Sequence, residues 1–179
     1  MPKIVMVLQS GWVRVLDWDT QLLIASSRSR RWWLTRAMRA LTRAGDTAGW
    51  FVHGAVLAAL LPDGASHVQL LVAGAVVGTA LSQLLKRLCR RSRPDHAIES
   101  FAASMANPDL FSFPSGHSTV AFAVATALSS AHPVLGGLEL ALATAIACSR
   151  VGLGAHYPLD VTAGVLLGVA SGLAATLLV

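Results

Sequence analysis

A histidine and an aspartate stand four residues apart in the stretch SRVGLGAHYPLD, at residues 149–160. Pro158 lies between them and suits the first turn of a helix. If that helix begins near Tyr157, Asp160 falls about one turn from His156. Its carboxylate can then bond one imidazole nitrogen while the other stays free to attack. An interfacial histidine beside an aspartate that complements the helix dipole would explain the pair equally well.

Two further polar stretches supply positive charge and the start of a helix. KRLCRRSRPDH contains five basic residues, Lys86, Arg87, Arg90, Arg91 and Arg93. FSFPSGHST contains Ser115 and Gly116 directly before an apolar segment that begins near His117. The free amides in the first turn of a helix make an anion site together with the helix dipole, and a serine there offers an N-cap. Each stretch alone has an ordinary explanation, as a basic anchor to lipid phosphates or as a capped loop.

Together the three stretches contain what phosphoryl transfer without a metal requires. Arginine and lysine side chains neutralise phosphate oxygens, a neutral histidine attacks, and a second histidine protonates the leaving oxygen. The ordinary explanations would have to coincide three times. The cysteines, Cys89 and Cys148, have no metal-ligand spacing, and no metal is expected.

These side chains stand in a chain that is mostly hydrocarbon. Of its 179 residues, 54% are hydrophobic and 13% are charged, which is too apolar for a soluble domain. Five apolar segments have roughly the length of a membrane-spanning helix, and none alternates like a barrel strand. We therefore predict an all-α membrane bundle of about five transmembrane helices, forming a single domain. The five segments are approximately residues 47–61, 68–85, 118–131, 138–149 and 158–179.

Residues 1–45 differ from the bundle at residues 46–179. They mix arginines and tryptophans with apolar residues, as in WWLTRAMRALTR. This pattern predicts helices in the membrane interface, with an irregular basic tail as the alternative. Arg14 and Asp17 interrupt the short apolar run near residues 4–15, so a cleaved signal peptide is not expected. Whether that run forms a short first span stays open.

Counting five crossings places the polar stretches on one side of the membrane. The N-terminal segment and the loops at residues 86–117 and 150–157 share that side, which also holds almost every Lys and Arg. The short links near Pro62 and Pro133 lie on the other side. The third and fourth apolar segments are short and rich in Gly, Ala, Ser and Thr, which favours close helix packing. A compact bundle with a cationic site at one end is predicted.

At these positions the sequence resembles the type 2 phosphatidic acid phosphatase (PAP2) superfamily. The three motifs of that family are matched in residue type and spacing over roughly residues 86–160. The resemblance implies a helical membrane bundle that removes phosphate from a lipid phosphate without a metal or other cofactor. The matched residues are Lys86, Arg93 and Pro94, then Pro114, Ser115, Gly116 and His117, then Ser149, Arg150, His156 and Asp160.

The resemblance also implies a role for each site residue. Lys86, Arg93 and Arg150 would hold the phosphate. Ser115 and the backbone amide of Gly116 would help to bind it.

By the same resemblance, three residues would perform the reaction. His156 would be the nucleophile that becomes phosphohistidine, Asp160 its orienting partner and His117 the general acid, and water would then hydrolyse the intermediate. His156 must be neutral while His117 must be protonated, although both start from a pKa of about 6.5. Their environments must therefore differ.

The expected substrate is a lipid phosphate that enters sideways from the bilayer, because little of the chain lies outside the spans. Undecaprenyl diphosphate is our first expectation by resemblance, followed by phosphatidylglycerophosphate and phosphatidate. The loop at residues 95–111 is expected to cover the site, and Asp95, His96 and Glu99 in it are interpreted as solvated. The expected partners are this lipid and the bilayer, with no nucleic acid. The oligomeric state cannot be deduced from the sequence.

Charge and resemblance disagree about orientation. The positive-inside tendency places the arginine-rich side in the cytoplasm, whereas the resemblance implies a site outside it. Lys86, Arg93 and Arg150 have a catalytic purpose and are poor topology signals. The arginines at residues 28–43 lack that purpose and would bind anionic lipid. We expect an integral protein of the bacterial inner membrane with its active site facing outward.

Three other classes of protein fit the sequence less well. A transporter would hold polar groups in the middle of its spans, whereas here they stand at span ends, except for His53. A non-catalytic lipid-binding protein would show broken motifs. A soluble haloperoxidase with a similar anion pocket conflicts with the apolar composition.

Overall fold

Eight helices account for the regular structure of the chain's described part. The computed structural model describes residues 2–28, 31–99, 101–105 and 109–179, and the side chains of residues 2–12 and 28 lie outside the description. The helices are α1 (Pro2–Arg28), α2 (Trp32–Ala44), α3 (Thr47–Leu60), α4 (Gly64–Cys89), α5 (Pro94–Ala97), α6 (Gly116–Ala131), α7 (Pro133–Gly152) and α8 (Pro158–Ala175).

All five apolar segments that were expected to span the membrane are helical. Within the described ranges, α4, α7 and α8 are long and apolar enough to cross a membrane, and α3 is a shorter apolar helix. The prediction of an all-α membrane bundle is confirmed. Some helices begin earlier than the apolar segments do: α4 begins at Gly64 and α7 at Pro133. In α7, His132 caps the helix through Leu135 N and Pro133 occupies the first turn, so local capping rather than hydropathy sets the start.

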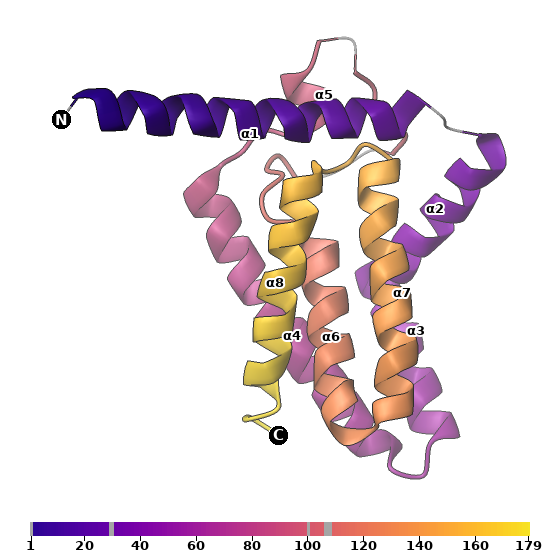
Figure 1. Cartoon of the computed structure of the whole chain (residues 1–179). Coiled ribbons are helices and arrows are strands. Elements are labelled where there is room, and N and C mark those ends of the chain that lie inside the picture. The colour runs from indigo at the N-terminus through magenta and orange to yellow at the C-terminus, as the bar shows by residue number, and fades with distance from the viewer. Residues whose placement is uncertain (1, 29–30, 100, 106–108) are drawn as a thin grey trace.

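Helix α6 lies at the centre of the bundle, packed against α4, α7 and α8 (Figure 1). Small residues permit this closeness. A Cβ on Gly168 of α8 would come within 2.5 Å of the carbonyl oxygen of Thr119, and one on Gly172 equally close to that of Ala123. A Cβ on Gly74 of α4 would lie 3.0 Å from the same Ala123 oxygen. Backbone therefore packs on backbone, as expected for helices associating in lipid.

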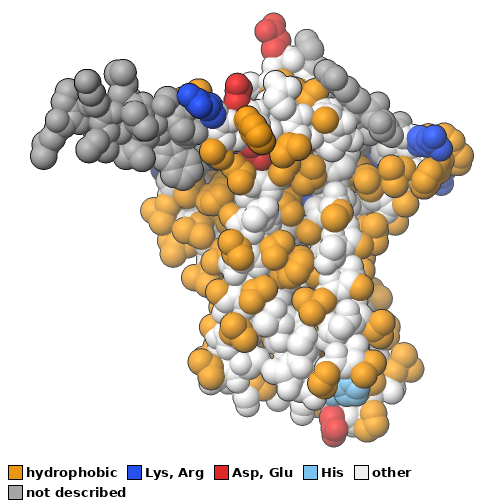
Figure 2. Space-filling view, in the orientation of Figure 1, with side chains coloured by type: hydrophobic (Ala, Val, Ile, Leu, Met, Phe, Trp, Pro, Cys, Tyr) orange, Lys and Arg blue, Asp and Glu red, His pale blue; other side chains and the backbone are white. Residues whose placement is uncertain are grey.

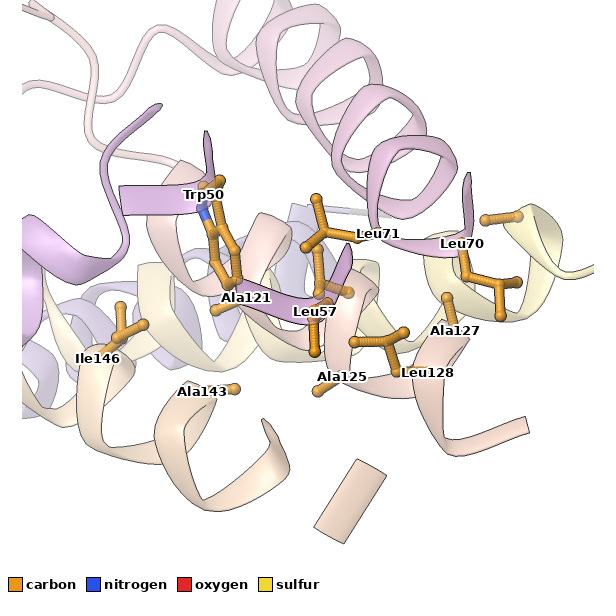
Figure 3. Packing of buried hydrophobic residues seen from close by; sticks show 12 residues of the cluster. Trp50, Leu57, Leu70, Leu71, Ala121, Ala125, Ala127, Leu128, Ala143 and Ile146 are labelled. Atoms are coloured by element: carbon orange, nitrogen blue, oxygen red, sulfur yellow. The ribbon is translucent and has the colours of Figure 1, made fainter. Parts of the chain in front are cut away.

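A cluster of apolar side chains fills the space between these helices (Figure 3). Trp50 and Leu57 of α3 meet Leu71 of α4, Leu128 of α6 and Ile146 of α7 in it. Hydrophobic side chains also cover the outer flank of the bundle, whereas charged ones gather toward its ends (Figure 2). An apolar flank with polar ends is the surface that a bilayer requires.

The N-terminal helices take two different positions. Helix α1 lies across one end of the bundle, and α2 descends beside α7 toward α3 (Figure 1). Residues 4–15 belong to the continuous helix α1 and form no separate span beside the bundle. Two buried side chains of α1, Asp19 and Leu23, anchor it to the bundle. In α2, the hydroxyl of Thr42 lies 2.6 Å from the hydroxyl of Ser149 of α7. The interfacial location of residues 1–45 stays a prediction.

Candidate active site

The predicted site residues meet at the end of the bundle that α1 covers. Lys86 and Arg150 come from the last turns of α4 and α7, and His117 and Asp160 from the first turns of α6 and α8, which all reach that end (Figure 1). Arg93 and His156 come from the segments that follow α4 and α7. Most of them are deeply buried: Arg93 is 3% exposed, Arg150 2%, His156 1% and Asp160 0%. Four buried charged or titratable groups at one end of an apolar bundle point to a functional site.

The hydrogen bonds of His156 fix which of its nitrogens is free. Nδ1 lies 2.8 Å from the carbonyl oxygen of Ser112, and a carbonyl only accepts, so Nδ1 carries the proton. Nε2 lies 3.2 Å from Nη1 of Arg93, which only donates. The lone pair of Nε2 therefore faces the cations of the site, where a phosphate would bind.

The surroundings of His156 keep it neutral. Burial, together with the nearby cations Arg150 and Arg93, lowers the pKa of His156 well below its ordinary value. A neutral imidazole with its lone pair at Nε2 is the form that can attack phosphorus.

Asp160 organises the chain around His156 more than it holds the ring. Its Oδ2 is 3.7 Å from His156 Nδ1, too far for a hydrogen bond, and accepts from the amide of Tyr157 at 3.0 Å. Its Oδ1 accepts from Nη1 of Arg91 at 2.7 Å. The carbonyl of Ser112 orients the ring. The sequence did not reveal this contact, because every residue type has a backbone carbonyl.

The predicted anion cradle forms between α4, α6 and the segment after α4. A Cβ on Gly116 would lie 3.8 Å from Nζ of Lys86, so the start of α6 faces that ammonium group. Arg93 donates from Nη1 to the carbonyl oxygen of Ala155 at 2.8 Å. Ser115 is the N-cap of α6, as expected, and its hydroxyl is engaged by Ser118.

Arg150 reaches the site from α7 with support from α2. Its Nη1 lies 3.4 Å from the hydroxyl of Thr42, which in turn contacts Ser149. Helix α2 therefore helps to position the third predicted phosphate ligand, a role that its sequence did not indicate.

His117 has a partner that the sequence analysis missed. Its Nε2 lies 2.8 Å from Oδ1 of Asp46. Asp46 occupies the N-cap position of α3, yet its side chain makes no capping hydrogen bond. Burial and the charge of Arg150 oppose protonation of the ring, whereas the carboxylate of Asp46 favours the protonated form that a general acid requires.

A second missed carboxylate belongs to the loop at residues 95–111. Asp109 forms an ion pair with Lys86, and Arg93 donates from Nε to its carbonyl oxygen. Burial would raise the pKa of Asp109, but the hydrogen bonds from Lys86 and from the amide of Phe111 hold it below its ordinary value. The loop thus places a negative charge on two of the cations expected to bind phosphate.

His53, the one histidine expected inside a span, is paired away from this site. Its Nε2 lies 2.9 Å from Oε1 of Glu139, between α3 and α7. Among the described residues, no group of three or more His, Cys, Asp or Glu side chains is placed to hold a metal ion.

Comparison with known proteins gives a consistent family. Residues 67–179 match the sequence profile of the PAP2 superfamily. The chain is 38% identical over 135 residues to a decaprenylphosphoryl-5-phosphoribose phosphatase of Mycobacterium tuberculosis, covering 75% of this chain and 74% of that protein. It is 41% identical over 92 residues to a lipid A 1-phosphatase of Rhizobium johnstonii, covering 49% of this chain and 38% of that protein.

Two solved structures share the fold. A transmembrane PAP2 type phosphatidylglycerolphosphate phosphatase from Bacillus subtilis superposes with a TM-score of 0.72 at 24% identity, over 92% of this chain and 86% of that one. LpxE of Aquifex aeolicus superposes with a TM-score of 0.75 at 25% identity, over 87% of this chain and 92% of that one.

Proposed function

This chain belongs to the PAP2 superfamily and is a membrane phosphatase of lipid phosphates, and we propose that it acts on a polyprenyl-linked phosphate through a phosphohistidine at His156. The observation that carries the proposal is the buried, neutral imidazole whose Nε2 lone pair faces Arg93. His117, another histidine of this site, is instead bonded through Nε2 to the carboxylate of Asp46.

In the first step, Nε2 of His156 forms a bond to phosphorus while the bond from phosphorus to the leaving oxygen breaks. His117 gives its proton to that oxygen. Lys86, Arg93 and Arg150 neutralise the phosphate oxygens, and the amide of Gly116 at the start of α6 adds a hydrogen bond. Ser115 keeps this amide in place by capping the helix.

In the second step, water attacks phosphorus and the P–N bond breaks. The neutral His117 accepts the proton of the water, which restores its acid form. Inorganic phosphate leaves, and His156 returns to its neutral state with the proton still on Nδ1, held by Ser112.

A polyprenyl chain is supported by two kinds of relative. The Mycobacterium tuberculosis protein is a phosphatase of decaprenylphosphoryl-5-phosphoribose, and a protein of Escherichia coli that is 46% identical over 68 residues is a putative undecaprenyl-diphosphatase. Undecaprenyl diphosphate remains the first substrate to test, and decaprenylphosphoryl-5-phosphoribose is the second. The apolar flank in Figure 2 allows the chain to stay in the bilayer while the phosphate enters the cradle.

We also propose that the site faces outward from the bacterial inner membrane. The positive-inside tendency favours the opposite orientation, but some of the arginines on this side of the bundle are bound within the structure. Arg91 is bound by Asp19 and Asp160, and Arg39 donates to the carbonyl oxygen of Ser104, so these charges have structural uses besides setting topology.

The test measures phosphate release by the detergent-purified protein in the presence of EDTA. The four substrates compared are undecaprenyl diphosphate, decaprenylphosphoryl-5-phosphoribose, phosphatidylglycerophosphate and phosphatidate. We expect a polyprenyl substrate to be preferred, and rapid quenching with ³²P-labelled substrate to trap an acid-labile label on the protein.

The matched variants are His156→Gln and His96→Gln, because His96 is an exposed histidine of the covering loop. The first should lose both the trapped label and at least about 10³-fold in kcat, whereas the second should lose neither. Turnover by His156→Gln at the wild-type rate would exclude the phosphohistidine, and preference for a glycerophospholipid would exclude the polyprenyl substrate.

A further inference from the structure

Arg91 joins two buried carboxylates that come from opposite ends of the sequence. Its Nη1 donates to Oδ1 of Asp160 and its Nη2 to Oδ2 of Asp19, both at 2.7 Å. Asp160 is fully buried and Asp19 is 2% exposed. The guanidinium also stacks on the ring of Tyr157, with Cζ 3.9 Å from the ring centroid. Arg91 is thus held by two ion pairs and an aromatic face.

The second oxygen of Asp19 binds the start of α8. Oδ1 accepts from the amide of Leu159 at 2.8 Å, while Asp160 accepts from the amide of Tyr157. Both amides belong to the helix start that directly follows His156. A carboxylate from α1 and one from α8 itself therefore fix this junction, and Arg91 fixes the two carboxylates relative to each other.

The charges of this group bear directly on His156. Oδ2 of Asp160 is 3.7 Å from His156 Nδ1, so its negative charge favours the protonated ring unless it is neutralised. Arg91 supplies that neutralisation. Burial opposes its charge, but the carboxylates of Asp160 and Asp19 outweigh burial and raise the pKa of Arg91, so it stays charged.

We propose that Arg91 and Asp19 are positioning residues of the active site, which fix the start of α8 behind His156 and set the charge that Asp160 presents to it. The proposal rests on the nucleophilic role of His156. It makes α1 part of the active site, because Asp19 of α1 accepts hydrogen bonds from both Arg91 and the amide of Leu159.

The sign of each charge gives two opposite expectations. Without Arg91, the charge of Asp160 is uncompensated and His156 protonates more easily. Without the negative charge of Asp19, the positive charge of Arg91 is less compensated, so His156 protonates less easily. The charged and titratable groups that face His156 from all packed elements are Lys86, Arg93, His117, Arg150 and Asp160, with Arg91, Asp19 and Asp109 one contact further out.

The first variant is Arg91→Met, with Arg87→Met as its control, because Arg87 is an exposed arginine in the same basic stretch. We expect Arg91→Met to lower kcat roughly tenfold or more, to leave KM nearly unchanged, and to move the acid limb of kcat/KM upward by about one pH unit. Arg91→Lys should recover part of kcat. Arg87→Met should behave as wild type.

The second variant is Asp19→Asn, with the exposed Asp17→Asn of the same helix as its control. The amide oxygen of Asn can still accept from Leu159, so the helix start is kept while the charge is lost. The acid limb should move downward, opposite to Arg91→Met. A role in folding alone would move neither limb.

Titration of the His156 ring by ¹⁵N NMR, without substrate, separates this proposal from the proposed function. Opposite shifts of the ring in Arg91→Met and Asp19→Asn support the positioning role even if no lipid tested is hydrolysed. Identical titration in wild type and both variants overturns it, whatever the activity. If Arg91→Met does not fold, the ring titration in Asp19→Asn decides: a downward shift supports the positioning role, and no shift overturns it.

Discussion

As the proposed nucleophile, His156 must keep an unprotonated Nε2 at the pH where the enzyme works. Burial and the cations Arg150 and Arg93 lower its pKa well below the ordinary value of about 6.5. The attacking form therefore persists as the pH falls through 6.5 and is lost only when the pH falls through the lowered pKa. The same environment would not suit an acid, which is why the second histidine needs a different neighbour.

The acid limb of kcat/KM is accordingly expected below the ordinary histidine pKa of about 6.5. It should be measured with the titration of the substrate phosphate recorded separately by ³¹P NMR, because a phosphate monoester itself titrates near pH ~6. A limb at pH 6.5 or above, after that correction, would contradict a neutral buried nucleophile.

Asp46 gives His117 the neighbour that an acid needs, at 2.8 Å from its Nε2. In Asp46→Asn the protonated ring loses its opposite charge, so the basic limb of the kcat profile should move to lower pH and kcat at neutral pH should fall. Asp63→Asn is the control, because Asp63 also occupies an N-cap position but stands at the opposite end of the bundle. Equal profiles for the two variants would remove Asp46 from the reaction.

At the level of elements, the proposed roles of Lys86 and Arg93 imply that the loop at residues 95–111 competes with the substrate. Asp109 binds Lys86 and approaches Arg93, so an incoming phosphate must displace a carboxylate. Asp109→Asn should therefore lower KM several-fold, by roughly 1 kcal/mol of binding free energy, and leave kcat unchanged. Glu99→Gln, an exposed acid of the same loop, removes the same charge without the contact. An unchanged or higher KM for Asp109→Asn would mean that the carboxylate does not block the cradle.

Helix α6, which carries His117 in its first turn, packs closely against α8. A Cβ on Gly168 would lie 2.5 Å from the Thr119 carbonyl oxygen and 2.8 Å from Cβ of Phe122, so Gly168→Ala forces the two helices apart. We expect a loss of about 1–3 kcal/mol in unfolding free energy, seen as a lower thermal midpoint in detergent. Gly54→Ala is matched, because nothing lies within 4 Å of the added methyl on α3. Equal thermal midpoints for the two variants would show that the α6–α8 contact accommodates the added methyl group without loss of stability.

At the level of the whole molecule, orientation follows from which end of the bundle faces outward. Both cysteines are exposed, and Cys89 ends α4 beside the site. In Cys148→Ala, a membrane-impermeant thiol reagent added to intact cells should label Cys89 if the site faces outward. The reverse control is the Cys-free protein with Asp63→Cys at the other end, which should stay unlabelled. Labelling of the second variant instead would place the site in the cytoplasm.

The sequence was sufficient to predict the helices and to expect the eight proposed site residues at one end of the bundle. A membrane-spanning helix follows from a local run of apolar residues, and the motifs lie at span ends, so five crossings already placed Lys86, His117 and His156 at one end of the bundle. The cap at Ser115 was likewise readable, because capping depends on residues a few positions apart.

The partners of those residues were decided by tertiary structure alone. Asp19, Asp46 and Asp109 looked like ordinary helix or loop aspartates, and Ser112 contributes only its backbone carbonyl. Asp19 lies 72 positions from Arg91, and Asp46 lies 71 positions from His117. Residue type states which charge a side chain carries, but helix packing determines which opposite charge lies within hydrogen-bonding distance. That contact therefore determines the charge that surrounds each histidine.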